Sequence, residues 1–366
     1  MQFIDLKTRH QLIGDKINAR IQKVMAHGQF ILGPEVREVE EKLAQYTGSK
    51  HCVTVSSGTD SLLIALMALG VGAGDEVITV PYTWISTAEV ISLLGAKPVF
   101  VDIRPDTWNL DETLLETAIS DKTKAIMPVS IYGQCSDMDA INEIAKKYNL
   151  PVIEDAAQSF GATYKGKQSC NLSTIGSTSF FPSKPLGCYG DGGALFTNDD
   201  ELAEKFRWIR VHGQERKHHH PILGLNGRMD TIQAAILLEI LEVFTDEVQK
   251  REKLGQTYSE GLAHLHGLET PRIGEYNTSV YAQYTLLSEQ REQIQQSLKG
   301  KDIPSVSYYS VPLHLQPVFN HLGHKEGDFP VAEKVATQCL SLPMSPYLTQ
   351  EDQSEVIDAI SKIEKS

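Results

Sequence analysis

The sequence predicts an α/β fold in which a large domain with a mixed, mostly parallel sheet precedes a smaller C-terminal α+β domain. Apolar runs typical of buried strands alternate with stretches of helical periodicity through the first half of the chain. The chain has 366 residues, which is more than one ordinary hydrophobic core organises. Beyond a long helical stretch that ends near position 260, the pattern changes to shorter strands and a closing helix.

The expected elements of the large domain follow in order along the chain. Strands are expected over residues 76–80, 98–101, 125–129 and 151–153. Helices are expected over 61–69, 87–94 and 138–148, where apolar positions recur every three or four residues. A long apolar helix over 230–244 leads into a charged helix over 246–260, and the last helix is expected over 351–363. We therefore divide the chain into domains at 1–245 and 246–366.

Composition excludes several classes of protein. Hydrophobic residues make up 41% and charged residues 22%, as in a soluble globular protein. The net charge of -13 argues against general nucleic-acid binding, which needs clustered cations. No apolar run reaches membrane-spanning length and no secretory signal pattern is present, so we expect a cytoplasmic protein. The five cysteines lack zinc-site spacing and are expected to be reduced.

A run of small residues precedes the first helix of the large domain. It reads Ser56-Ser57-Gly58-Thr59-Asp60. Free amides and the positive end of the helix dipole would point the same way there, which suits a phosphate group. A plain helix cap is the alternative, and the carboxylate of Asp60 would have to turn away from a bound phosphate.

The strand over 151–153 runs into Glu154, Asp155 and, slightly later, Gln158. Open α/β sheets bind ligands at the carboxyl ends of their strands. A carboxylate there can keep a pyridine nitrogen protonated, and Gln158 is near enough to reach an adjacent ring substituent. Alternatively, Asp155 caps a following helix.

Lys184 stands between an aromatic strand and a glycine-rich turn, in the run Ser179-Phe180-Phe181-Pro182-Ser183-Lys184-Pro185-Leu186-Gly187. An enclosed lysine loses its proton more easily than an exposed one, as a nucleophilic amine requires. Most lysines are solvated surface charges, so the surrounding residues carry this interpretation.

Together these motifs resemble the DegT/StrS family of nucleotide-sugar aminotransferases over essentially the whole chain. The resemblance is carried by Glu154-Asp155-Ala156-Ala157-Gln158 and Ser179-Phe180-Phe181-Pro182-Ser183-Lys184, with Phe3-Ile4-Asp5-Leu6, Gly33-Pro34-Glu35-Val36 and Leu342-Pro343-Met344 at the two ends. It implies the pyridoxal-phosphate-dependent aspartate aminotransferase fold, fold type I, with pyridoxal 5'-phosphate as cofactor.

The resemblance also implies a role for each matching residue. Lys184 would be the Schiff-base lysine and move protons, Asp155 would pair with the pyridinium nitrogen, and Gln158 would contact the ring hydroxyl. The remaining cofactor contacts would be the phosphate ligands Gly58, Thr59 and Ser179, the stacking ring of Trp84, and Asn226 from a second subunit. A homodimer with shared active sites follows. Dehydratases of the family carry histidine where this chain has Lys184, so lysine favours transamination.

A finer resemblance concerns the substrate. The runs around Lys184, at 132–135 and at 169–174 resemble enzymes that aminate C3 of a UDP-linked 3-oxo N-acetylglucosaminuronic acid, with glutamate as donor, in surface-polysaccharide synthesis of the O-antigen type. Arg228 is the expected ligand of the uronate carboxylate, although it could serve the donor carboxylate or a subunit salt bridge. Tyr309 and His314 are further expected substrate residues.

Some features leave alternatives open. Tyr308 and Ser345 stand where relatives often have histidine, so the substrate end of the site could differ from that subgroup. Another keto sugar linked to UDP or dTDP is one alternative, and a cofactor-binding regulator is another. The run His218-His219-His220 invites a metal site, but adjacent side chains diverge on regular structure, and we expect no metal.

Overall fold

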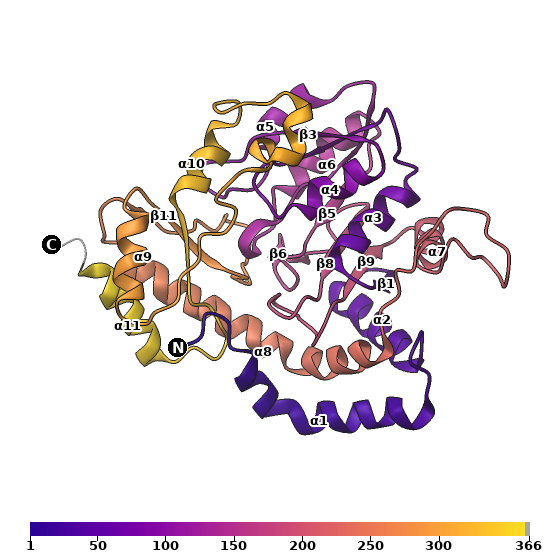
Figure 1. Cartoon of the computed structure of the whole chain (residues 1–366), viewed down its shortest axis with the longest axis horizontal. Coiled ribbons are helices and arrows are strands. Elements are labelled where there is room, and N and C mark those ends of the chain that lie inside the picture. The colour runs from indigo at the N-terminus through magenta and orange to yellow at the C-terminus, as the bar shows by residue number, and fades with distance from the viewer. Residues whose placement is uncertain (363–366) are drawn as a thin grey trace.

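A computed structural model describes residues 1–362 and is built around one twisted sheet (Figure 1). A four-stranded part has the order β1-β9-β8-β5 and a three-stranded part the order β3-β2-β4. Parallel bridges from Ile126 to Val152 and from Val129 to Asp155 join β4 to β5 and make the sheet continuous. Strand β9 runs antiparallel to both neighbours, whereas the remaining pairings are parallel. This is the mixed, mostly parallel sheet that the sequence predicts.

Some strands of this sheet were expected from the sequence and others were not. Their bounds are β1 (His51–Val55), β2 (Glu76–Thr79), β3 (Lys97–Phe100), β4 (Thr123–Ile126), β5 (Ile153–Asp155), β8 (Ile175–Ser179) and β9 (Gly193–Thr197). Strands β2 to β5 were expected within three residues of these bounds. Strands β1, β8 and β9 were not expected; in β1 and β8, buried small or polar residues such as Thr54, Gly176 and Ser177 interrupt the apolar run.

Helices cover both faces of the sheet. On one face α3 (Gly58–Ala68), α4 (Ser86–Leu93) and α7 (Asp200–Ile209) pack over Val53 and Leu195. On the other face α1 (Leu6–His27), α2 (Pro34–Thr47) and the first half of α8 (Thr231–Leu262) pack over Cys52 and Phe196. Successive side chains of a strand point to opposite faces, so β1 and β9 each supply both cores. Helix α6 (Met138–Lys147) covers the β2 to β5 side.

Helix α8 (Thr231–Leu262) is continuous over 32 residues and lies across the molecule above α1 (Figure 1). The expectation of two separate helices that meet near position 245 is therefore wrong. Neither Thr245 nor Asp246 breaks a helix, and the change from apolar to charged residues reflects a change of surroundings instead. Phe244 belongs to the core under the sheet, and Tyr258 to the core of the C-terminal part. A domain boundary at 245 would lie inside this helix, and the division stays a prediction.

The C-terminal part contains a small antiparallel sheet of order β10-β11-β12. Its strands are β10 (Leu268–Glu269), β11 (Tyr284–Ser288) and β12 (Cys339–Leu342), and they share a core with α9 (Arg291–Lys299) and α11 (Gln350–Ser361). The last helix was expected to reach residue 363, which lies outside the described residues. Within the described residues, the shorter elements are α5 (Glu112–Leu115), β6 (Thr163–Tyr164), β7 (Lys167–Gln168) and the 3-10 turns η1 (Glu116–Ala118), η2 (Ile131–Gly133), η3 (Leu313–Leu315) and η4 (Pro317–Leu322).

One C-terminal segment returns to the large sheet. Helix α10 (Pro330–Gln338) supplies Ala332, Val335 and Ala336 to the core that also contains Ile78 and Phe100 of the large sheet. The carboxylate of Asp102, just after β3, accepts the amide N–H groups of Val331 and Ala332 at 2.9 and 3.0 Å. It thereby caps the start of α10, where unpaired amides need acceptors. The loop before α10 is in this way held beside the carboxyl ends of the parallel strands.

Candidate active site

A cavity of about 390 Å³ opens where β2, β4 and β5 end. This is the edge at which open α/β sheets bind ligands, and the volume lies within the range of small-molecule sites. Most of the expected site residues line it. They are Gly58, Thr59, Trp84, Asp155, Gln158, Ser179, Lys184 and Tyr309.

Lys184 is held in a closed turn after β8. Its amide donates to the carbonyl of Phe181 at 2.8 Å, and the amide of Cys188 donates to the carbonyl of Phe180 at 2.8 Å. Gly187 permits the closure, because a Cβ there would lie 2.6 Å from the carbonyl oxygens of Phe181 and Pro182. Burial lowers the pKa of the Lys184 amine, and the negative charge of Asp155 opposes that shift. The neutral, nucleophilic amine is therefore favoured at lower pH than in an exposed lysine.

Asp155 ends β5 and is buried at the floor of the cavity. Its Oδ2 accepts from the hydroxyl of Thr87 at 2.9 Å, and its Oδ1 accepts from the amide of Ala157 at 3.2 Å. Burial raises the pKa of this carboxyl, while Thr87, Ala157 and Lys184 oppose the rise. The alternative that Asp155 caps a helix is wrong, because the next described element is the short strand β6. The carboxylate is free to face a ligand.

The amide of Gln158 is fixed at both ends. Its Oε1 accepts the amide N–H of Tyr132 at 2.9 Å, and its Nε2 donates to the hydroxyl of Tyr309 at 3.0 Å. The rings of Tyr132 and Tyr309 stack with centroids 6.1 Å apart, and Tyr82 packs edge-on to both. Both stacked tyrosines have positive φ, 56° and 57°, a conformation that costs energy in residues with side chains. This arrangement fixes the orientation of the Gln158 amide.

The start of α3 forms a tight concavity against Ser179. A Cβ on Gly58 would lie 2.6 Å from the Cβ of Ser179, so only glycine allows this approach. The side chain of Ser57 caps the helix by accepting from the amide of Asp60 at 3.0 Å. The carboxylate of Asp60 is hydrogen-bonded to the hydroxyl of Ser56 and does not line the cavity. The Ser57 cap therefore leaves the expected phosphate site open, and the acidic side chain of Asp60 is turned away.

Three residues that line the cavity were not predicted as site residues from the sequence. Thr87, which orients Asp155, lies at the start of an expected helix, and its hydroxyl could have been noticed there. Tyr308 lines the cavity, although it was noted only as a departure from the family pattern. Gln283 also lines it, and no local motif marks that position.

Trp84 is 61% exposed, so its indole is accessible from outside the cavity.

Three expected residues do not line the cavity. Asn226 is exposed and Arg228 is half-buried, both at the end of the loop after α7. The side chain of His314 is enclosed, and its expected contact with substrate stays a prediction. Its Nε2 pairs with Glu333 at 3.0 Å and its ring packs on Phe329. Burial lowers the pKa of His314, with Glu333 opposing the shift.

The three consecutive histidines have ordinary surroundings. His219 pairs with Glu215 at 2.8 Å, and His220 contacts the carbonyl of His212 at 2.9 Å. Within residues 1–362, no group of three or more His, Cys, Asp or Glu side chains is placed to hold a metal ion. Over the same residues, no helix combines the length and apolarity needed to cross a membrane.

Comparison with known proteins agrees with this geometry. A relative from Pseudomonas aeruginosa, UDP-2-acetamido-2-deoxy-3-oxo-D-glucuronate aminotransferase, is 58% identical over 95% of this chain and 96% of its own length. The pleiotropic regulatory protein of Geobacillus stearothermophilus is 46% identical over 98% and 97%.

Solved structures are similar to this chain as well. An aminotransferase from Brucella abortus superposes over 100% of both chains with a TM-score of 0.97 and 42% identity. Ntda from Bacillus subtilis with bound cofactor PMP has a TM-score of 0.92 and 32% identity, covering 100% of this chain and 83% of that one. The DegT/DnrJ/EryC1/StrS aminotransferase family model matches residues 11–361. The chain therefore belongs to the DegT/DnrJ/EryC1/StrS aminotransferase family.

Proposed function

We propose that this enzyme transfers an amino group from glutamate to C3 of a UDP-linked 3-oxo N-acetylglucosaminuronic acid. The observation that carries the proposal is the meeting of Lys184 and Asp155 in one cavity of a chain that is 58% identical to an aminotransferase of that sugar. Family membership establishes the aminotransferase, and the sugar and the donor are the proposed parts.

The residues of the cavity fit pyridoxal phosphate, the cofactor of this family. Gly58 and Ser179 approach so closely that a Cβ on the glycine would fill the space, and the first amides of α3 point from that corner. Gly58, Thr59 and Ser179 would hold the phosphate, Asp155 the ring nitrogen and Gln158 the ring hydroxyl. Bound pyridoxal phosphate supplies the electron sink that lets an amine pass from one carbon to another.

Lys184 would perform the proton transfers. Its amine lies in a site where burial lowers its pKa, so it can exist as the neutral base at moderate pH. Asp155 faces the same cavity, and a carboxylate that remains charged there would hold a proton on the ring nitrogen. Thr87 and the amide of Ala157 stabilise that charge by hydrogen bonds. The exposed Trp84 would cover the ring from the solvent side.

The substrate is tested by two half-reactions on the purified holoenzyme. Glutamate should remove the visible absorption of the lysine-bound cofactor and release 2-oxoglutarate. The UDP-linked 3-oxo uronate should then restore that absorption. Restoration only by another UDP- or dTDP-linked keto sugar would keep transamination and overturn the proposed substrate.

A second candidate is a cofactor-binding regulator. It is favoured by the 46% identity to a protein named as a pleiotropic regulator. A regulator that binds the cofactor passively would show no release of 2-oxoglutarate from glutamate. Catalytic turnover with a keto sugar would exclude purely passive binding.

We also propose a homodimer in which Asn226 reaches the partner's cofactor phosphate and Arg228 the partner's substrate. Both residues lie outside their own cavity, and the Nε of Arg228 is buried without a hydrogen-bond partner among residues 1–362. Nearby on the same loop Leu223 is 87% exposed, as an interface residue would be in an isolated chain.

The five free, buried cysteines suit the reducing cytoplasm, the compartment proposed for a role in surface-polysaccharide synthesis.

Mixed dimers test the shared site. Lys184→Ala and Asn226→Ala chains should each be weak alone, because each dimer repeats its defect in both sites. Mixing them should restore activity, since one site of the mixed dimer has both native residues. Failure of the mixture to exceed its components, with subunit exchange demonstrated by mass, would contradict the proposed crossing of Asn226.

A further inference from the structure

Gln283 is a buried amide on the wall of the active-site cavity. It immediately precedes β11 and is 8% exposed. The lining residues fall within 57–192 except for Gln283, Tyr308 and Tyr309, so these three form the side of the cavity that the C-terminal part supplies. The Oε1 of Gln283 is buried and has no hydrogen-bond partner among residues 1–362. Buried polar atoms are normally paired, so an orphan beside a binding cavity points to a ligand.

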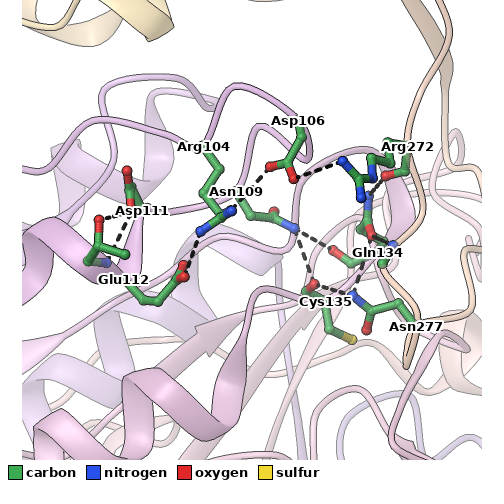
Figure 2. Close-up of polar contacts among 11 residues, drawn as sticks. Arg104, Asp106, Asn109, Asp111, Glu112, Gln134, Cys135, Arg272 and Asn277 are labelled. Carbon is green, nitrogen blue, oxygen red and sulfur yellow. Dashed lines mark hydrogen bonds and ion pairs between the residues drawn. The ribbon is translucent and has the colours of Figure 1, made fainter.

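The backbone that precedes Gln283 is held by hydrogen bonds of side-chain amides. Figure 2 shows Gln134, whose Nε2 donates to the carbonyl of Arg272 at 2.7 Å and whose Oε1 accepts the amide of Gly274 at 3.1 Å. In the same view Asn277 donates to the carbonyl of Cys135 at 3.0 Å. These bonds tie the segment over 272–277 to the turn that follows β4. The approach to Gln283 is therefore rigid.

The residues between the segment over 272–277 and Gln283 are also conformationally constrained. Tyr281 has φ of 41°, and its amide donates to the hydroxyl of Ser279 at 3.1 Å. A Cβ on Gly133 would lie 2.6 Å from the amide nitrogen of Tyr281, and the amide of Val280 donates to the carbonyl of Gly133 at 3.0 Å. Backbone held in a costly conformation is typical of functional sites. It leaves Gln283 little freedom to find a partner within the protein.

We infer that Gln283 is a substrate-binding residue that hydrogen-bonds a hydroxyl or N-acetyl group on the ring of the keto sugar. The inference rests on the proposed function and names a specificity determinant of the same site. Apart from the partner's Asn226, the residues that would hold the cofactor come from 58–184, whereas Gln283 belongs to the C-terminal part of the lining, which leaves it to the substrate. A neutral amide can donate and accept, as ring hydroxyls and N-acetyl groups require. A site built to hydrogen-bond a substrate group discriminates strongly against analogues that lack it.

A structural role is the rival explanation. Gln283 also lines a separate cavity of about 10 Å³ together with Trp108, whose indole Nε1 is likewise buried without a partner among residues 1–362. A space of that size admits about one water molecule. If Gln283 serves only this interior space, its removal should change the stability of the enzyme and leave sugar recognition intact.

The test uses Gln283→Leu and Gln283→Met in the holoenzyme, two shapes without the hydrogen bond. We expect the KM for the UDP-linked keto sugar to rise about tenfold. The rate of the glutamate half-reaction and the spectrum of the bound cofactor should stay within twofold of wild type. Gln353→Leu is the matched control, because Gln353 is a buried glutamine outside the cavity whose Nε2 donates to the carbonyl of Leu254 at 2.7 Å. It should leave the KM for the sugar unchanged.

Two results would overturn the inference. One is an unchanged KM for the sugar in whichever Gln283 variant folds, and the other is an equal loss in the glutamate half-reaction. The wild-type enzyme is first assayed with the 3-oxo uronate and a panel of other keto sugars. If only another sugar is converted, the proposed substrate fails, and the role of Gln283 is then tested with the converted sugar.

Discussion

The two sides of the active-site cavity differ in how their polar groups are satisfied. On the side supplied by residues 57–192, Asp155 and Gln158 each hold hydrogen bonds at both ends of the side chain. On the side supplied by the C-terminal part, the Oε1 of Gln283 is buried without a hydrogen-bond partner among residues 1–362, and Tyr308 also lines the cavity. Under the proposed function, the protein itself pre-organises the cofactor side, whereas the substrate side keeps a polar group for a ligand to satisfy.

The largest effect should come from Lys184→Ala, which removes the base from the cofactor side. We expect turnover to fall by about 1,000-fold or more, because proton transfer by a positioned side chain contributes on that scale. Single-turnover rates with glutamate measure the loss. Lys165→Ala is the control, since Lys165 is an exposed lysine paired with Asp139. A Lys184→Ala enzyme with normal turnover would remove the basis of the assignment.

Asp155→Asn should cost about 100-fold in turnover, the scale of losing one positioned electrostatic group. It also has a predicted pH signature. The negative charge of Asp155 raises the pKa of Lys184 against the lowering by burial, so its removal should lower that pKa further. The neutral amine then appears at lower pH. Cofactor uptake by the apoenzyme, measured against pH, should reach half its maximal rate at lower pH in the variant; a shift to higher pH would contradict this electrostatic account.

Tyr309→Phe tests the bond that joins the two sides. The hydroxyl of Tyr309 accepts from Gln158 at 3.0 Å, and its ring stacks on Tyr132. Loss of one hydrogen bond of about 1 kcal/mol should weaken cofactor binding and raise the KM for the sugar by about fivefold each. Equilibrium titration of the cofactor and steady-state kinetics report these separately. A change in only one of them would show that the two sides are independent.

The smallest effect is expected from Tyr308→Phe. Tyr308 lines the cavity and is half-buried, and its ring lies 5.9 Å from that of Tyr309. Because the variant retains the ring, the KM for the sugar should rise by about threefold, less than one full hydrogen bond. Cofactor affinity should not change. A weakened cofactor affinity would break the division of the cavity into two sides.

The same division explains what the sequence could predict. The residues of the cofactor side stand in short motifs at strand ends and helix starts, so Gly58, Asp155, Gln158 and Lys184 could be named before the structure was known. Parallel strands bring their carboxyl ends to one edge, which assembles those motifs by topology alone.

The substrate side depends on contacts between distant segments, which no local pattern reports. The burial of His314 against Phe329 and its pairing with Glu333 arise from tertiary packing, so the sequence could not predict them. Gln283 was missed because a sequence does not show that its Oε1 is buried without a hydrogen-bond partner among residues 1–362. The break expected near position 245 was wrong, since a change in residue type along α8 marks a change of neighbours and not of secondary structure.

The most direct test of the central claim is the visible spectrum of the holoenzyme during the two half-reactions. Glutamate should abolish the absorption of the Lys184-bound cofactor, and the UDP-linked 3-oxo N-acetylglucosaminuronate should restore it as the amino sugar forms. If the absorption never appears on adding pyridoxal phosphate, or never responds to glutamate, the assignment of Lys184 and Asp155 as the catalytic centre is contradicted.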